Sequence, residues 1–221
     1  IHQPNYIPWI GYFHKIAHSE IFVIFDDVQL SRGKDVVVRN LIKTEGGPKW
    51  LRVPVKDKNK MLMINKIEIN NDFDWQKNHL NSLHSNYQKA PFFNSYFKEI
   101  EKILNKRHRF LLDLNLELIK LFMKILKIKT EIICSSTLNV NDSGTEKIMK
   151  IIQILKGDKY ITGVGKGSKR YILDKHMYFH ENNVKIAYQK FEVPKYRQLF
   201  NEFIPNLSIC DILFNIGGNE T

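Results

Sequence analysis

Polar and charged side chains occur at two points early in the chain where predicted strands end. His2 lies in the opening turn His2–Asn5, and Asp26 and Asp27 directly follow the apolar run Ile21–Phe25. Consecutive strands of a parallel sheet end at one edge, so these groups are expected to face the same crevice. An imidazole there can act as a general base or hold a substrate hydroxyl or amine, and a carboxylate can orient the imidazole, bind an amine or ligate Mg²⁺. The predicted catalytic residues are therefore His2, Asp26 and Asp27.

Each of these assignments has a structural alternative. A lone histidine at a strand end can simply hydrogen-bond to the backbone, and one of two adjacent aspartates is expected to point away and cap a turn or helix. The other histidines and the cysteines Cys134 and Cys210 lack the spacing of metal ligands. The sequence therefore predicts no metal site.

A glycine-rich turn late in the chain is the second place where chemistry is expected. The short apolar run Tyr160–Thr162 passes into GVGKGSKR ahead of a predicted helix. Glycines at a strand end let the backbone present N–H groups to an anion, and neighbouring lysines can neutralise its charge. A flexible turn with solvated lysines is the alternative, since the Gly-x-x-x-x-Gly-Lys-Ser/Thr pattern of phosphate loops is absent. The predicted phosphate-binding residues are Gly163, Gly165, Lys166, Gly167 and Lys169.

Further polar and aromatic side chains flank the predicted catalytic groups. The guanidinium of Arg39 can clamp a carboxylate or phosphate with two hydrogen bonds, although an ion pair with Asp26 or Asp27 would explain it equally well. Tyr6 and Trp9, placed on a polar turn, can line a pocket for a sugar or a base. The predicted substrate-binding residues are Gln3, Asn5, Tyr6, Trp9, Gln29, Arg39, Asn40 and Lys43.

The elements that must position these groups follow an α/β pattern. Residues 1–70 contain the opening turn, a short helix, a strand, and the extended runs Trp50–Val55 and Met61–Ile69, which are predicted to pair antiparallel. Residues 71–128 form a helical block with helices predicted over Trp75–Tyr87, Asn94–Leu104 and Arg109–Leu126. Residues 129–221 return to α/β, and their predicted strands are Glu131–Cys134, Tyr160–Thr162 and Val184–Gln189.

These elements predict one domain over residues 1–221 with an α/β fold. We expect a Rossmann-like, mostly parallel sheet flanked by helices, with the helical block in the middle and a small antiparallel extension. Ser143 with Glu146, and Ser208 with Asp211, are predicted to form capping boxes at two late helices. The chain starts on Ile1 directly at a turn, so a strand is expected before it.

Composition narrows the class of protein. The chain has 221 residues of which 43% are hydrophobic, enough for a full core, and two cysteines, which favours a reduced, cytoplasmic setting. No apolar run reaches the roughly 20 residues of a membrane span. A net charge of +11 is compatible with nucleic acid, an acidic membrane face or a phosphorylated substrate. Because the lysines are scattered and form no continuous Arg-rich stripe, nucleic acid is disfavoured.

Several stretches together identify a family resemblance. The opening HQPNYIPWIGYFHKIA, with FDDVQLS, RNLIKT and the closing LSICDILFN, resembles the WbqC-like protein family over nearly the whole chain. The resemblance implies a bacterial protein from gene clusters for O-antigen and other surface polysaccharides. It also implies that the stretch VRNLIKT, with Arg39, Asn40 and Lys43, belongs to the family pattern.

Residues and resemblance together predict an enzyme that modifies an activated sugar. Acyl or aminoacyl transfer to a sugar amine is the reaction we expect, with a sugar or nucleotide sugar as substrate and ATP with Mg²⁺ as the candidate cofactor. One alternative is a non-catalytic module that binds nucleic acid or a polysaccharide-assembly complex. Another is a nucleotidyltransferase-like enzyme, although Trp9 and Tyr12 stand where that fold has histidines around the glycine that Gly11 matches. The oligomeric state is left open.

Overall fold

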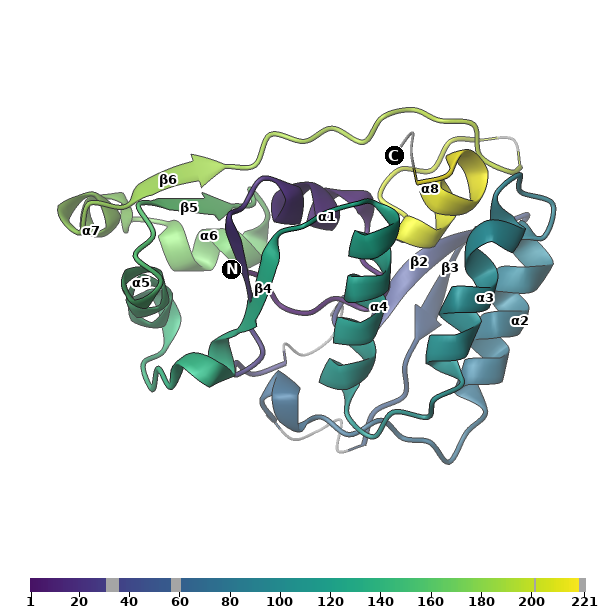
Figure 1. The fold of residues 1–221 in the computed structure, drawn as a ribbon, viewed down its shortest axis with the longest axis horizontal. Helices are drawn as coiled ribbons and strands as arrows, with labels where there is room; N and C mark the ends of the chain where they lie inside the picture. Colours follow the sequence, from purple (N-terminus) through teal and green to yellow (C-terminus); the bar gives the residue numbers. More distant parts are fainter. Residues whose placement is uncertain (31–35, 57–60, 201, 219–221) are drawn as a thin grey trace.

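The structure is a computed structural model that describes residues 1–30, 36–56, 61–200 and 202–218 (Figure 1). The strands are β1 (Ile21–Ile24), β2 (Arg39–Thr44), β3 (Gly47–Arg52), β4 (Glu131–Cys134), β5 (Lys159–Thr162) and β6 (Lys185–Tyr188). The helices are α1 (Ile10–Ala17), α2 (Trp75–Tyr87), α3 (Phe93–Leu104), α4 (Leu111–Ile125), α5 (Gly144–Ile154), α6 (Lys166–Ile172), α7 (His176–Glu181) and α8 (Ile209–Ile216), with short 3-10 turns η1 (Ile64–Lys66) and η2 (Ser135–Leu138).

The centre of the molecule is a short parallel pairing around β1. One edge of β1 pairs in parallel with β4, from Ile21 opposite Glu131 to Ile24 opposite Cys134. The other edge holds the start of the chain, where the His2 N–H donates to the Val23 carbonyl at 2.9 Å and the His2 carbonyl accepts from the Phe25 N–H at 2.8 Å. The opening residues are thereby fixed beside a buried strand.

The predicted α/β class is confirmed, but the pairing differs from a single open sheet. The described residues form three two-stranded sheets, with β1 and β4 parallel, β5 and β6 parallel, and β2 and β3 antiparallel. The Rossmann-like part of the prediction is therefore not confirmed. Each parallel pair still has the helix-linked connection that parallel strands require.

The antiparallel extension exists, but its main strand pairing differs from the predicted one. β2 pairs with β3 across a turn of two residues, with Thr44 opposite Gly47, whose φ of +103° suits a glycine. Closing a two-residue turn orders far less chain than joining the runs 50–55 and 61–69 would. The predicted pairing survives only as an isolated bridge between Val55 and Ile69.

The helical block is confirmed close to its predicted bounds. In Figure 1, α2, α3 and α4 stand at one end of the molecule, where α3 packs on α2, α4 and α8. Leu111, Leu114, Leu118 and Phe122 of α4 recur at helical spacing and are fully buried. Burying each such side chain contributes about 1.5–3 kcal/mol, so this stripe fixes the helix in the larger of the two hydrophobic cores.

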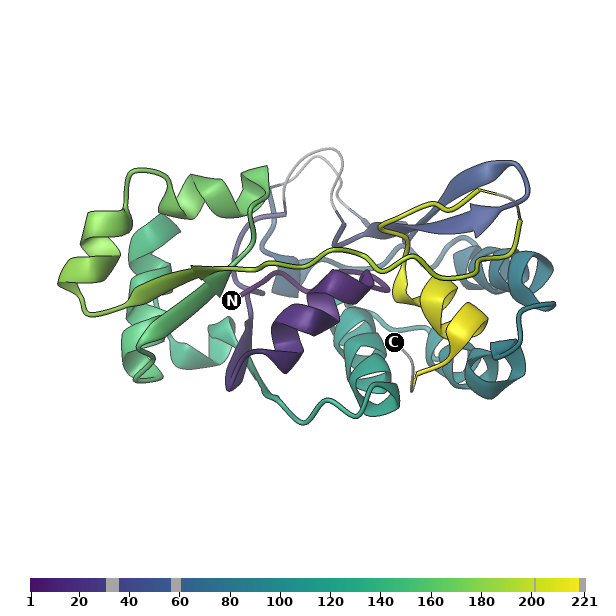
Figure 2. The same ribbon diagram turned by 90° about the horizontal axis from the view of Figure 1, so that it is seen from above.

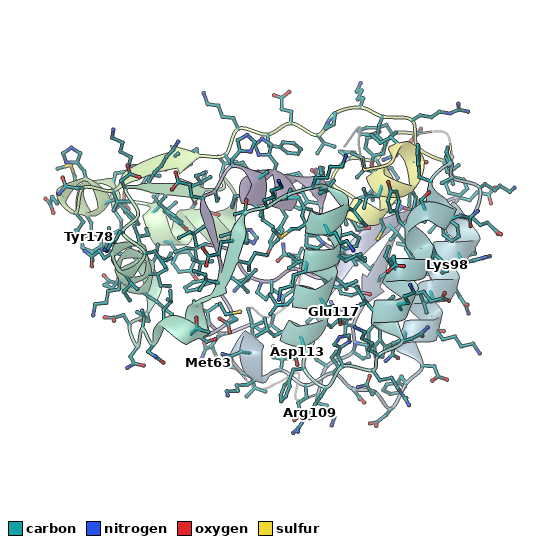
Figure 3. The ribbon with its side chains drawn as sticks, viewed as in Figure 1. Met63, Lys98, Arg109, Asp113, Glu117 and Tyr178 are labelled. Atoms are coloured by element: carbon teal, nitrogen blue, oxygen red, sulfur yellow. The ribbon has the colours of Figure 1, made fainter. Side chains whose placement is uncertain are left out.

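A polar cluster closes the connection into α4. Glu117, labelled in Figure 3, accepts a hydrogen bond from His108 Nε2 at 2.7 Å and also pairs with Lys106. Both partners precede α4, so the cluster attaches the connection before this helix to the helix's second turn.

A second, smaller core forms at the other end. It gathers side chains of α5, α6, α7 and β5, among them Ile148, Ile151 and Phe179 (Figure 1). The helix predicted after the glycine turn is broken into α6 and α7, and Asp174 between them has a φ of 60°. The segment 189–200 then returns over α1 toward α8, as Figure 2 shows, and so connects the smaller core to the end of the molecule that holds α8.

The two predicted capping boxes are not formed. Neither Ser143 at α5 nor Ser208 at α8 makes a side-chain cap hydrogen bond. At α5, Gly144 has a φ of +61° and turns the chain between the serine and the first helical turn. At α8, Asp211 is engaged by two tyrosines instead, as described below.

Candidate functional site

A cavity of about 410 Å³ lies between the opening turn of the chain and the glycine turn after β5. Three of the predicted residues of the opening turn line it, and so do Trp9 and two of the predicted phosphate-binding glycines. α1, the returning segment after β6, and apolar side chains such as Ile148 and Tyr171 supply the remaining wall. The residues that line the cavity include His2, Gln3, Asn5, Trp9, Gly11, Tyr12, Lys15, Gly163, Gly165, Ser168, Gln189 and Phe191.

His2 presents an uncharged imidazole to this cavity. Its ring packs edge-on against Tyr12 at a centroid distance of 4.9 Å. Burial, reinforced by the nearby charge of Lys15, lowers the pKa of His2 to about 3. Nδ1 lies 3.1 Å from the Gln3 carbonyl, which can only accept, so this hydrogen bond places the ring proton on Nδ1. Nε2 is then the unprotonated nitrogen that can accept a proton or hydrogen bond from a ligand.

Two amide side chains of the opening turn have unused polar atoms. Gln3 Nε2 and Asn5 Oδ1 are buried, and neither has a hydrogen-bond partner among the residues that the structure describes. An unsatisfied buried polar group costs about 1–3 kcal/mol, so a polar ligand that supplies the missing partners would be favoured. Asn5 is only 3% exposed, and its amide is held in place by the surrounding core.

Lys15 enters the same cavity from α1. Its side chain is buried, with 4% of the residue exposed, and burial lowers its pKa to about 8. The sequence interpretation passed over this lysine. The signal was its spacing, because Lys15 falls three and four residues after Tyr12 and Gly11 and therefore on the buried face of α1.

The outer wall combines Trp9 with the returning segment. An ideal Cβ on Gly11 would lie 2.2 Å from Trp9 Cη2, so only glycine lets the indole lie across this helical turn. Gln189 Nε2 donates to the Gly11 carbonyl at 2.7 Å, and Phe191 packs edge-on against Trp9 at 5.7 Å. No sequence pattern points to Gln189 or Phe191, since their role depends on a crossing of chain segments far apart in sequence.

The two predicted catalytic aspartates do not line the cavity. Asp26 is fully buried and accepts hydrogen bonds from the backbone and hydroxyl of Ser136, at 3.0 and 2.6 Å. Asp27 pairs with Lys147 at 2.7 Å and accepts from Ser135. Their oxygens are thus engaged by N–H, O–H and ammonium donors, an environment that does not fit Mg²⁺. The carboxylate expected to orient His2 is replaced in that position by the Gln3 carbonyl.

The predicted residues of β2 also lie away from the cavity. Arg39 stacks over the Trp50 ring, 4.1 Å from its centroid. Asn40 Nδ2 donates to the Tyr6 and Ile7 carbonyls at 3.3 and 2.8 Å and so braces the opening turn against the hairpin. Asn40 therefore positions the opening turn from behind, whereas Arg39 packs on the hairpin.

Lys43 belongs to a separate buried network. Its Nζ donates to Gln198 Oε1 at 3.1 Å and to the Glu202 carbonyl. Nearby, Asp211 accepts from the hydroxyls of Tyr87 at 2.8 Å and Tyr196 at 2.6 Å, and burial raises the pKa of this carboxyl. The capping role predicted for Asp211 is therefore wrong, because its carboxylate turns into the core.

The remaining predicted residues have other settings. The Tyr6 hydroxyl is 2.9 Å from His79 Nδ1 in the core, Gln29 forms an antiparallel bridge with Met63, and Lys169 is exposed. Lys166 and Gly167 lie outside the residues whose side chains are described. Within the described chain, no group of three or more His, Cys, Asp or Glu is placed to hold a metal ion, and no helix is long and apolar enough to cross a membrane.

Comparison with known proteins gives one family and one relative. The profile of the WbqC-like protein family matches residues 3–221. The uncharacterized protein Rv1507c of Mycobacterium tuberculosis is 33% identical over 217 residues, which cover 97% of this chain and 92% of the relative. No solved structure matches.

Proposed function

Because the chain belongs to the WbqC-like protein family, we propose that it is an enzyme of bacterial surface-polysaccharide assembly that modifies an activated sugar in the cytoplasm. The family resemblance supplies the biological setting. The cavity supplies the chemistry, since it joins the opening turn, which carries the family's most specific stretch, to the glycine turn.

The observation that carries this proposal is the neutral imidazole of His2 in a partly polar cavity. A volume of about 410 Å³ falls within the roughly 300–1,000 Å³ typical of small-molecule sites. Aromatic rings from Trp9 and Tyr12 suit the faces of a sugar ring, while Gln3 and Asn5 offer unused amide groups. Sugars need this mixture of ring contacts and hydrogen bonds.

The reaction that fits best is acyl transfer to a sugar amine. The neutral amine nitrogen attacks the carbonyl carbon of an activated acyl ester, and the new N–C bond forms. The bond from that carbon to the ester oxygen breaks, and the oxygen leaves with the electron pair and finally takes up the proton that the amine loses. The amine proton passes to Nε2 of His2, whose other nitrogen is held by the Gln3 carbonyl. With a pKa of about 3, His2 accepts this proton only as the amine becomes acidic during attack.

Calorimetric binding of nucleotide sugars and ATP tests the proposal. The wild type is expected to bind at least one nucleotide sugar, and His2→Ala to bind it about tenfold more weakly, the value of one hydrogen bond to a polar ligand. His180→Ala is the matched control, because this histidine is exposed on α7 and does not line the cavity.

Two results would count against the idea. One is a wild type that binds none of a panel of nucleotide sugars, and the other is a His2→Ala protein that binds them as well as His180→Ala does. Thermal melting of each variant separates a loss of binding from a loss of fold.

A further inference from the structure

Lys15 carries a buried ammonium group for which the described residues provide no partner. The residue is 4% exposed, and its Nζ makes no hydrogen bond or ion pair with the described residues. Its position on α1 directs the chain of methylenes toward the cavity that Lys15 helps to line. A desolvated charge of this kind is stabilised by a counter-charge.

The cavity wall does not contain that counter-charge. Its described lining residues include no aspartate and no glutamate, and the imidazole of His2 is uncharged. Its buried amides add an unused donor, Gln3 Nε2, and an unused acceptor, Asn5 Oδ1. Within the described lining, the charge of Lys15 is therefore left to be complemented by a ligand.

Gly163 marks where the ligand's charged group would sit. An ideal Cβ built on Gly163 would lie 3.2 Å from Ser168 Oγ and 3.7 Å from Lys15 Nζ. The hydroxyl and the ammonium thus both lie close to the Gly163 backbone, on the wall of the same cavity. The backbone of Gly163 is not in the left-handed region, so the crowding that a side chain would cause, and not the conformation, favours glycine here.

We propose that Lys15 and Ser168 bind an oxyanion of the ligand, a carboxylate or a phosphate ester, in the part of the cavity beside Gly163. The ammonium supplies charge and up to three N–H donors, and the hydroxyl supplies one more. The unused Asn5 Oδ1 complements an O–H or N–H elsewhere on the same ligand. The chemical class is a sugar that carries an acidic group.

This inference rests on the proposed function only in treating the cavity as a small-molecule site. It does not depend on which group is transferred or on the role of His2. It also moves the predicted anion site, because the charge comes from α1 and not from the lysines that follow the glycine turn.

Calorimetry with defined anions tests the subsite. The probes are glucose 1-phosphate, glucuronate and inorganic phosphate, with glucose as the neutral control. The wild type is expected to bind at least one sugar anion more tightly than glucose. Lys15→Met is expected to weaken that binding by about 30-fold, the usual effect of removing one partner of a buried charge pair.

A pair of glycine variants provides a steric test that keeps the charge. Gly163→Ala fills the space beside Lys15 and Ser168 and is expected to weaken the anion by about tenfold or more. Gly46→Ala is the matched control, because a Cβ there has only an ordinary contact of 3.9 Å with Thr44 Oγ1 and the residue does not line the cavity. Its anion binding is expected to match that of the wild type.

The outcomes separate this subsite from the proposed function. Preference for glucose 1-phosphate identifies a phosphate ester, and preference for glucuronate identifies a carboxylate. Equal binding of anions and glucose by the wild type, or unchanged anion binding in Lys15→Met or Gly163→Ala, would overturn the subsite. Anion binding that depends on Lys15 in a protein that binds no nucleotide sugar would leave the subsite standing and reject the proposed function.

Discussion

Lys15 and Lys147 show two ways of burying the same charge. Lys147 is 5% exposed and donates to Asp27 at 2.7 Å and to the Val140 carbonyl at 2.8 Å. Lys15 is buried to the same degree, at 4%, but no described acceptor reaches its Nζ. Burial alone therefore does not distinguish a structural lysine from a ligand-binding one. The hydrogen-bond and ion-pair partners of the ammonium make that distinction.

The surroundings of each lysine explain the difference. Lys147 lies where β1 ends, and Asp26, Asp27 and the serines of η2 complete each other's hydrogen bonds around it. Lys15 lies on a cavity wall without carboxylates. The hydrogen bonds around Lys147 stabilise the fold. The unpaired charge of Lys15 lowers the stability of the free protein, and a bound anion would remove that cost.

Removing the paired lysine should have the largest effect. Lys147→Met leaves Asp27, whose side chain is 14% exposed, without its counter-ion, and we expect a loss of about 3 kcal/mol in the free energy of unfolding. Urea unfolding near neutral pH measures it. The double variant Lys147→Met with Asp27→Asn should recover part of the loss, and a single-variant loss below about 1 kcal/mol would refute the structural role.

Removing the unpaired lysine should have the opposite sign. The pKa of Lys15 falls from 10.5 to about 8 on folding, so the folded state holds this proton less tightly than the unfolded state does. The penalty is complete below about pH 8 and is relieved as pH rises toward the unfolded value. We expect Lys15→Met to be about 2 kcal/mol more stable than the wild type near pH 7.

The pH dependence isolates this group. The stability difference between Lys15→Met and the wild type should narrow between about pH 8 and pH 10 in urea unfolding without added anions. A wild type that is more stable than Lys15→Met at neutral pH would mean that Lys15 has a structural partner.

Secondary structure was the part of the fold most accessible to sequence reasoning. The helix Trp75–Tyr87 and the strand Glu131–Cys134 have the bounds that their patterns predict, because a periodic apolar face depends on local spacing. Strand pairing was less accessible. The choice of β2 over residues 61–69 as the partner of β3 depends on the cost of closing each loop, and the hydrophobic pattern does not encode that cost.

Residues of the site could be predicted only where a residue type suited to binding or catalysis falls at an expected strand end. His2 and Gly163 were identified because each was expected at a strand end, and the structure places both on one cavity. Asp26 satisfies the same rule, yet its oxygens meet Ser136, more than a hundred residues away in the chain. The neighbour that a strand-end carboxylate contacts is determined by tertiary packing, which cannot be inferred from a single sequence.

The contrast between the two lysines also depends on the cavity wall keeping its shape. Gly11→Ala places a methyl group on the Trp9 ring, where contacts as short as 2.2 Å would force the indole to move. We expect a loss of about 2 kcal/mol in stability and a shift in tryptophan fluorescence, as overpacking usually produces. Gly165→Ala, whose Cβ meets open space, is the control. If both variants melt together with the wild type, the close packing of Trp9 on Gly11 is incorrect.

A third buried charge, Asp211, should give the smallest effect at neutral pH. Burial raises the pKa of its carboxyl, and the hydroxyls of Tyr196 and Tyr87 partly oppose this by stabilising the anion. The folded state therefore binds a proton more tightly than the unfolded state, so this contribution to stability is complete below the unfolded pKa of about 3.9 and is lost as pH rises through the folded value. Asp211→Asn should remove that slope from the dependence of the unfolding free energy on pH above about pH 4. At pH 7 it should change stability by about 1 kcal/mol or less, because relief of the buried charge offsets weaker tyrosine hydrogen bonds. If the pH dependence of stability persists in Asp211→Asn, it comes from another titratable group. Asp211 would then resemble the fully hydrogen-bonded charges around Lys147 more than the unpaired charge of Lys15.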